Sequence, residues 1–253
     1  MAASTRIRVV VIISANIEWQ AVRDLFAGQP VTMGASPYGE YFVTNLNIAP
    51  ATPAKGPEPL GPGPARRREP VLFLHGGWGK ISAAASAQYA IDRWRPQALI
   101  NLGTCGGFAG EIERGAVVLV ERTVVYDIIE QMLDADNALD HYATEIDLSW
   151  LGEDYPQPVR RTLLVSGDRD LVVEEIPRLK AKFGAAAGDW ESGAIAFVAA
   201  RNRMRLLILR GVTDLVGVGG GEAYGNVQVF IDATRQVMAN LLRHLPAWIA
   251  RAL

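Results

Sequence analysis

"SAAASAQYAIDRWRPQALINLG", residues 82–103, contains two different structural patterns in direct succession. Residues 82–94 are a helical candidate, and Pro96 ends it because proline cannot continue a helix. Residues 98–103 are nearly continuous in apolar side chains, which is typical of a strand covered on both faces. A helix followed directly by such a strand indicates a sheet with helices packed against it.

The same two patterns recur along the chain. Further short runs of valine, isoleucine and leucine occur at residues 8–14, 71–77, 116–126, 162–167 and 205–211. The helical candidates between them are residues 18–26, 174–183, 191–203 and 226–253. This alternation predicts an α/β fold with helices on both faces of a central sheet. We expect one domain over residues 1–253.

One segment does not suit a central sheet. Residues 47–70 are rich in proline and glycine and end in a basic stretch, so they can bury little apolar surface. They interrupt what otherwise reads as a hairpin from residues 40–46 to residues 71–77. We therefore predict a surface-loop insertion at 47–70 within the single domain.

The composition excludes several classes of function. Lys+Arg 25 against Asp+Glu 27 gives a formal charge of -2, so the chain has no positive field for nucleic acid or an anionic membrane. Its single cysteine, Cys105, rules out an internal disulfide and a cysteine-based metal cluster. The histidines have no ligand spacing, and no apolar run reaches the ~18 residues of a membrane span. We expect a cytoplasmic protein without metal or cofactor.

Ligands in open α/β sheets collect beyond the carboxyl ends of the strands. Glycines, hydroxyls and carboxylates follow the predicted strands at residues 14–18, 75–80, 103–110, 125–127, 166–172 and 210–214, and we expect these segments to line one pocket. Residues 76–82, "GGWGKIS", do not form a phosphate loop, because Leu74 and Ile81 stand where glycine and Ser/Thr are required. Residues 103–110, "GTCGGFAG", lack the spacing of a dinucleotide-binding loop. An ATPase and a dehydrogenase are therefore disfavoured.

An ordered set of motifs resembles the nucleoside phosphorylase and nucleosidase superfamily, and most closely its methylthioadenosine/S-adenosylhomocysteine nucleosidase branch. The matching pieces are "SANIEWQAV" (14–22), the segment 76–108, "GAVVLVERTVVYD" (115–127), "LLVSGD" (163–168), "GDWESGAIAFVA" (188–199) and "LRGVTD" (209–214). They stand in the family's order and cover most of the chain outside 47–70. The resemblance implies a three-layer α/β/α phosphorylase/hydrolase-like fold with a central mixed β-sheet.

The resemblance also implies two catalytic residues. Asp214 matches the aspartate that protonates N7 of the purine as the glycosidic bond breaks, and desolvation at the end of an apolar strand would keep its carboxyl protonated. The alternative is that Asp214 caps a helix or pairs with Arg210. Glu18 matches the glutamate that activates water, although an ungapped pairing would put Trp19 there. A first-turn helix carboxylate is the alternative for Glu18.

Substrate-binding residues follow from the same motifs. Glu191 matches the glutamate that accepts hydrogen bonds from both ribose hydroxyls, unless it only stabilises a helix N-terminus. Trp190 replaces the methionine usual before it, next to the 5′ group. The remaining predicted contacts, at the purine, are Thr104, Cys105, Gly106, Thr213 and the backbone of Leu171 or Val172. Asp170 stands where many relatives have a phenylalanine stacked on adenine.

Two arginines that bind phosphate in the phosphorylases are missing, with Asn101 in place of one of them. The resemblance therefore implies hydrolysis of the N-glycosidic bond of a purine nucleoside, with adenine favoured, such as 5′-methylthioadenosine or S-adenosylhomocysteine. It also implies a homodimer, with a place in methionine salvage. The alternatives are a phosphate-dependent purine nucleoside phosphorylase, a futalosine-type hydrolase and a non-catalytic nucleoside-binding relative.

Overall fold

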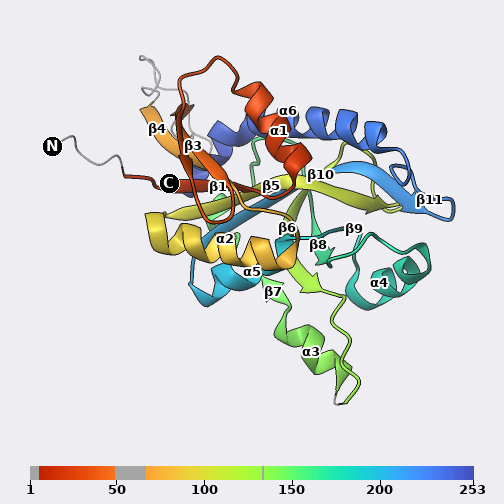
Figure 1. Cartoon of the computed structure of the whole chain (residues 1–253). Helices are drawn as coiled ribbons and strands as arrows, with labels where there is room; N and C mark the ends of the chain where they lie inside the picture. The colour runs from red at the N-terminus through yellow and green to blue at the C-terminus, as the bar shows by residue number, and fades with distance from the viewer. Residues whose placement is uncertain (1–5, 49–66, 133) are drawn as a thin grey trace.

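A computed structural model describes residues 6–48, 67–132 and 134–253, and one sheet runs through this part of the chain (Figure 1). The strands lie in the order β11-β10-β6-β8-β9-β5-β1-β4-β3-β2, and β7 pairs with β6. Their bounds are β1 Val9–Ile13, β2 Thr32–Ala35, β3 Glu40–Ile48, β4 Arg67–His75, β5 Ala98–Phe108, β6 Val117–Val125, β7 Thr144–Glu145, β8 Arg160–Ser166, β9 Ala187–Asp189, β10 Arg205–Gly217 and β11 Gly220–Gly221.

The sheet is mixed, as predicted. Strand β5 is parallel to β1 and to β10, whereas β6 is antiparallel to β10 and parallel to β8. Strand β9 then pairs with both β8 and β5. The pairs β5–β10, β10–β6, β6–β8, β8–β9 and β9–β5 therefore close a ring at one end of the sheet.

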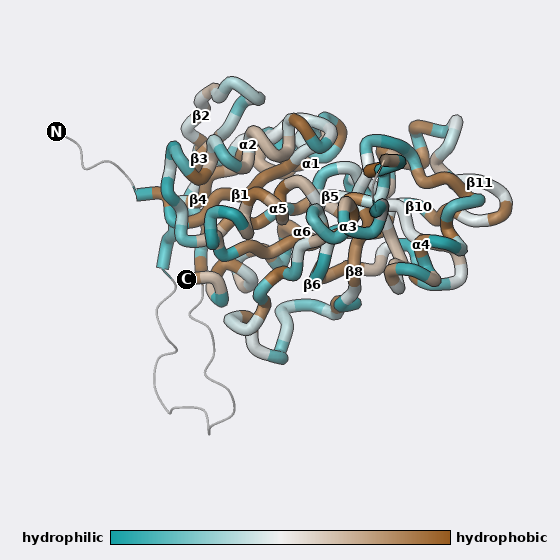
Figure 2. Tube along the Cα trace, turned by 90° about the horizontal axis from the view of Figure 1, so that it is seen from below, coloured by the Kyte–Doolittle hydropathy of each residue, from teal (hydrophilic) through white to brown (hydrophobic). Residues whose placement is uncertain are grey.

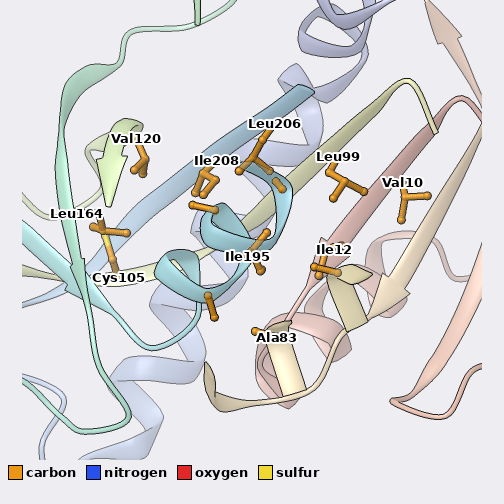
Figure 3. Close-up of a cluster of buried hydrophobic side chains, with 14 of the residues drawn as sticks. Val10, Ile12, Ala83, Leu99, Cys105, Val120, Leu164, Ile195, Leu206 and Ile208 are labelled. Atoms are coloured by element: carbon orange, nitrogen blue, oxygen red, sulfur yellow. The ribbon is translucent and has the colours of Figure 1, made fainter. Parts of the chain in front are cut away.

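Helices cover both faces of the sheet. Helices α1 (Asn16–Leu25) and α6 (Val227–Ala252) pack on one face, and α2 (Gly79–Trp94) and α5 (Ser192–Arg201) on the other (Figure 1). Alternate residues of β1 enter the two cores: Val9 and Val11 face α1 and α6, whereas Val10 and Ile12 join α2 and α5 (Figure 3). The α/β class with three layers is therefore confirmed.

The remaining elements are the short helix α3 (Ala135–His141), the 3-10 turns η1 (Ser149–Leu151) and η2 (Val173–Glu175), and α4 (Ile176–Phe183). Hydropathy follows the layers: hydrophobic residues concentrate along the central strands, and hydrophilic residues lie towards the outside (Figure 2). Within the described residues, every helix is too short or too polar to cross a membrane.

Strands β5 and β10 extend beyond the predicted bounds of 98–103 and 205–211. They pair in parallel as far as Phe108 and Val216, with a register shift between Val212 and Asp214. Residues 104–106 and 213–214, which lie in segments predicted to follow the strands, are therefore part of the strands. Glycines interrupt the apolar pattern of the sequence at these positions, so the predicted strands end there. The backbone pairing nevertheless continues past them.

The predicted loop 47–70 is wrong at both edges. Residues 47–48 belong to β3 and residues 67–70 to β4, where the two strands pair antiparallel. Pro70 is tolerated because pairing of β4 with β1 begins only at Val71. The Arg8 guanidinium also contacts the buried Glu69 carboxylate. Residues 49–66 lie outside the described part of the chain.

Candidate active site

A cavity of about 770 Å³ opens where β5, β9 and β10 approach the start of α1. All of the predicted site residues except Val172 line it: Glu18, Thr104, Cys105, Gly106, Leu171, Trp190, Glu191, Thr213 and Asp214. They come from segments far apart in the sequence. The extension of β5 and β10 past their apolar runs is what carries Thr104 and Asp214 to the cavity wall.

Val172 does not reach the cavity. It precedes the 3-10 turn η2, and its carbonyl accepts a hydrogen bond from the backbone N–H of Glu175. Leu171 does line the cavity, but its carbonyl already accepts a hydrogen bond of 2.9 Å from the Tyr224 hydroxyl. Of the two residues predicted to contact the base through the backbone, Leu171 is therefore the one that lines the cavity.

Glu18 and Trp19, the two candidates for the residue that activates water, have side chains in different environments. Glu18 is 2% exposed, and its Oε1 accepts hydrogen bonds from the Thr104 backbone N–H (2.6 Å) and hydroxyl (2.8 Å). Trp19 instead packs in the core, stacked on the His75 ring with centroids 5.4 Å apart. Of the two side chains, only that of Glu18 belongs to the cavity wall.

Arg210 lies at the centre of the polar side chains behind the cavity. Its side chain is fully buried, and its Nη2 contacts Asp189 Oδ2 at 2.9 Å and donates to Asn101 Oδ1 at 2.7 Å. Glu18 Oε1 lies 3.7 Å from Nη1, and Glu191 Oε2 lies 3.9 Å from Nη2. The suggested pair between Arg210 and Asp214 is therefore replaced by contacts with three other carboxylates.

Asp214 sits inside β10 rather than at a helix cap. The Thr213 hydroxyl donates to its Oδ1 at 2.9 Å, and the side chain is otherwise largely enclosed, at 6% exposure. Burial raises the pKa of Asp214, and hydrogen bonds from Thr213 and from the Ala223 backbone oppose this in part. Burial therefore favours the protonated form of this carboxyl relative to a carboxyl in water.

Glu191 is the N-cap residue of α5, yet its side chain makes no capping hydrogen bond. Its Oε1 instead accepts from the backbone N–H of Gly79, 3.1 Å away at the start of α2. Burial raises the pKa of Glu191 to about 8; Arg210 lowers it, whereas Asp189 and Glu18 add to the increase. The helix-cap interpretation of this glutamate is therefore not the one that the geometry supports.

Two tryptophans form one wall of the cavity. The rings of Trp78 and Trp190 stack with centroids 4.9 Å apart and planes 23° from parallel. Trp78 is 63% exposed, so the pair lies at the rim. Trp78 was not singled out as a site residue, but it belongs to the segment 75–80 that was predicted to line the pocket.

Cys105 is a buried wall residue. It belongs to the hydrophobic cluster between the sheet and helices α2 and α5 (Figure 3). Burial raises the pKa of its thiol, which opposes thiolate formation. Its neighbour Gly106 lies against the Leu171 side chain, which would be 3.1 Å from an added Cβ.

Sequence reasoning missed several lining residues. Tyr224 and Phe230 come from the segment after β11 and the first turn of α6, where no motif marks them. Asp189 also lines the cavity, whereas Arg210 lies behind its wall. Arg210 had a usable signal, because an arginine inside an apolar run is buried and a buried charge requires a partner. Among the described residues, no cluster of three or more His, Cys, Asp or Glu is arranged to hold a metal ion.

Residues 63–247 match the family model described as "Phosphorylase superfamily". The chain is 28% identical over 151 residues to a 5′-methylthioadenosine/S-adenosylhomocysteine nucleosidase of Thermotoga maritima, covering 59% of this chain and 68% of that protein. It is 25% identical over 184 residues to a nucleosidase of the same name from Geobacillus, covering 68% of this chain and 78% of that protein.

Solved structures show a similar fold. An S-adenosylhomocysteine nucleosidase from Streptococcus pyogenes, in complex with 5-methylthiotubericidin, superposes with a TM-score of 0.71 at 17% identity, covering 97% of this chain and 99% of that one. A 5′-methylthioadenosine/S-adenosylhomocysteine nucleosidase from Helicobacter pylori gives a TM-score of 0.70 at 12% identity, covering 96% and 99%. At these identities the likeness establishes the fold.

Proposed function

The chain belongs to the phosphorylase superfamily, and from that premise we propose that it is a nucleosidase. It hydrolyses the N-glycosidic bond of a purine nucleoside, with adenine as the base, such as 5′-methylthioadenosine or S-adenosylhomocysteine. One observation carries the proposal: Glu18, Glu191 and Asp214 come from three separate segments and line the same cavity. Relatives with nucleosidase names add support.

Asp214 acts as the general acid. A purine anion is a poor leaving group, and a proton delivered to N7 as the C1′–N9 bond breaks removes the charge that would develop on the base. The buried position of Asp214 supports this role, because burial raises its pKa and favours the protonated form. Thr213 holds the carboxyl by the 2.9 Å hydrogen bond to Oδ1.

Glu18 acts as the general base. Water attacks C1′, its oxygen forms the new bond to the sugar, and Glu18 takes the proton that the water releases. The two hydrogen bonds from Thr104 occupy Oε1, whereas Oε2 has only a 3.2 Å contact with the Ala15 backbone N–H. Oε2 is therefore the oxygen better able to accept a proton from water.

Glu191 binds the ribose. In its ionised form a carboxylate accepts hydrogen bonds from both vicinal hydroxyls, and its negative charge stabilises the positive charge that gathers on the sugar ring in the transition state. The side chain lies next to Trp190, which then contacts the sugar or its 5′ group. The base lies against Gly106, Leu171 and Tyr224.

Hydrolysis is favoured over phosphorolysis by the charges at the cavity. Among the described lining residues, Arg169 is the one cation, and its Nη1 lies 3.4 Å from Glu175 Oε1. Arg210 lies behind the wall and is already in contact with carboxylates. A phosphate dianion would therefore meet Glu18, Glu191 and Asp214 without a free cation to bind it.

The test is an incubation of the purified protein with 5′-methylthioadenosine, with and without phosphate, followed by chromatography of the base and the sugar. We expect adenine and free methylthioribose at the same rate in both samples. A sugar 1-phosphate formed only with phosphate would identify a phosphorylase. Binding without product, for this nucleoside and for futalosine and its amino analogue, would identify a non-catalytic relative.

We also propose a cytoplasmic homodimer that acts in methionine salvage. Exposed apolar side chains support a partner: Trp78 and Ile81 at the start of α2, and Ile129 and Met132 after β6, are all at least 63% exposed. The Lys80 ammonium contacts the Asp127 carboxylate, so these two segments are neighbours. Light scattering at the chain's mass of 27.4 kDa distinguishes a monomer from a dimer.

A further inference from the structure

Asp189, the last residue of β9, is the most strongly hydrogen-bonded carboxylate of the cavity wall. Its side chain is 2% exposed. Oδ1 accepts a hydrogen bond of 2.6 Å from the Ser166 hydroxyl, and Oδ2 accepts one of 2.5 Å from the Ser192 hydroxyl and one of 3.1 Å from the Ser192 backbone N–H. Oδ2 also lies 2.9 Å from Arg210 Nη2. Both oxygens are therefore held in place from several elements.

A single guanidinium faces three buried carboxylates at this point. Arg210 approaches Asp189 to 2.9 Å, but Glu18 only to 3.7 Å and Glu191 only to 3.9 Å. The Ser192 hydroxyl accepts from Arg210 Nε at 2.9 Å and donates to Asp189, so it fixes the two groups to each other. Coulomb attraction weakens with distance, so Arg210 attracts the Asp189 carboxylate more strongly than it attracts Glu18 or Glu191.

We propose that Asp189 is a positioning residue that decides which carboxylate Arg210 neutralises. Because Asp189 holds the guanidinium close to its own oxygen, the positive charge of Arg210 stabilises the ionised forms of Glu191 and Glu18 less. The inference deepens the proposed function, because Glu191 and Glu18 are the groups that function assigns to the ribose and the water. Asp189 acts on Glu191 in two ways, through the position of Arg210 and through its own negative charge.

The protonation of Glu191 is the measurable consequence. Four groups face its carboxyl: Arg210 from β10, Asp189 from β9, Glu18 from α1 and the Gly79 backbone N–H from α2. Burial raises the pKa of Glu191 most, Arg210 lowers it, and the negative charge of Asp189 raises it further. Without the charge of Asp189, both the lost repulsion and the freed guanidinium favour the ionised form of Glu191.

The test uses thermal unfolding, which requires no substrate. The raised pKa means that the folded protein keeps the Glu191 proton at pH values where the unfolded chain has released it. The stability that this proton contributes is therefore lost as the pH rises from the ordinary carboxyl range towards about 8. The difference in Tm between the wild type and Glu191→Gln, measured from about pH 5 to about pH 9, isolates this effect.

We expect Asp189→Asn to reduce the change of this Tm difference with pH. The amide keeps the shape of the side chain and removes the charge, so the midpoint of the Glu191 effect moves down by about one pH unit or more. Asp170→Asn is the matched control, because it removes a cavity carboxylate that does not act on Glu191, and it leaves the midpoint where it is. Should Asp189→Asn not fold, Asp189→Ser removes the same charge and leaves space for a water.

An unchanged midpoint in both Asp189 variants would overturn the proposal. The acidic limb of kcat/KM for 5′-methylthioadenosine provides a second readout, and we expect it to move to lower pH in Asp189→Asn, which general loss of structure would not cause. If no variant hydrolyses a nucleoside but the Tm midpoint shifts, the proposed function fails and the role of Asp189 stands. If hydrolysis is present and neither midpoint moves, the role of Asp189 fails alone.

Discussion

Thr104 donates two hydrogen bonds to one oxygen of Glu18, from its backbone N–H at 2.6 Å and from its hydroxyl at 2.8 Å. This arrangement joins the first turn of α1 to the extended end of β5, two segments that are 86 residues apart. It fixes the rotamer of Glu18 and directs Oε2 away from Thr104. Glu18 also completes the capping box of α1, because its Oε2 accepts a hydrogen bond of 3.2 Å from the Ala15 backbone N–H. The contacts with Thr104 therefore come in addition to a helix-cap role.

Glu18→Gln is expected to lower kcat by about 10²–10⁴-fold, because the amide keeps the hydrogen bonds to its oxygen but cannot take a proton from water. Substrate affinity should change little, since Glu18 is assigned to the water and not to the nucleoside. Single-turnover hydrolysis and equilibrium binding of 5′-methylthioadenosine measure the two quantities. Gln20→Glu, on the exposed side of the same helix, serves as a control. A Glu18→Gln protein with wild-type kcat would remove this residue from the mechanism.

Asp214→Asn is expected to lower kcat by a similar factor while nucleoside binding persists. The amide retains the size of the carboxyl but has no acidic proton for N7. Glu222→Gln is the matched control: it lies in the neighbouring loop, accepts from the Leu215 backbone N–H and does not line the cavity. Its charge raises the pKa of Asp214 less than burial does, so we expect a much smaller loss of kcat. Equal losses in the two variants would point to a disturbed loop rather than to a missing acid.

The pH dependence of the reaction should report Asp214. Because its protonated form is the acid, kcat falls as the pH rises through the pKa of Asp214, which burial raises above the usual carboxyl range. The hydrogen bond from the Thr213 hydroxyl lowers that pKa by favouring the ionised form. In Thr213→Val the alkaline limb should therefore move to higher pH. A shift to lower pH would mean that the hydroxyl favours the protonated acid instead.

The layers of the fold could be predicted because the apolar runs of the strands are continuous and alternate with helical segments that end at polar residues. The bounds of β5 and β10 could not, because Gly103, Gly106, Gly107 and Gly211 break the apolar pattern inside paired strands. Backbone hydrogen bonds continue across these glycines, and a hydropathy pattern does not detect them.

Motifs predicted Glu18, Glu191 and Asp214 as site residues but not Asp189, and the contacts among these carboxylates required the tertiary structure. A local alignment did not distinguish Glu18 from Trp19, and packing separates them: the indole joins the core against Phe42 and His75. The partner of Arg210 was equally open, since a guanidinium reaches any carboxylate that the fold brings near. Tyr224 lies in a glycine-rich turn without periodicity, so no pattern indicates that its hydroxyl reaches Leu171.

Gly103→Ala should inactivate and destabilise the protein. A Cβ at this position would lie 2.1 Å from Arg210 Nη1 and 2.7 Å from Glu18 Oε1, and both side chains are buried and paired. Moving either one costs on the order of 1–3 kcal/mol, which corresponds to a Tm lower by several degrees. Gly219→Ala is the matched control, because no atom lies within 4 Å of its added Cβ. A Gly103→Ala protein with unchanged Tm and kcat would show that Arg210 can shift freely.

Trp190→Met should change the choice of 5′ group more than the rate on the preferred nucleoside. The indole of Trp190 takes up space beside Glu191, where the sugar and its 5′ substituent are assigned, and it supports Trp78 by stacking. The smaller, flexible methionine opens this end of the cavity, so kcat/KM for S-adenosylhomocysteine should rise relative to 5′-methylthioadenosine, by roughly tenfold. Trp150→Met changes a tryptophan outside this cavity and should leave the ratio constant. Removing an indole that contacts the 5′ group would change how tightly that group binds. An unchanged ratio in Trp190→Met would therefore place the 5′ group elsewhere along the cavity wall.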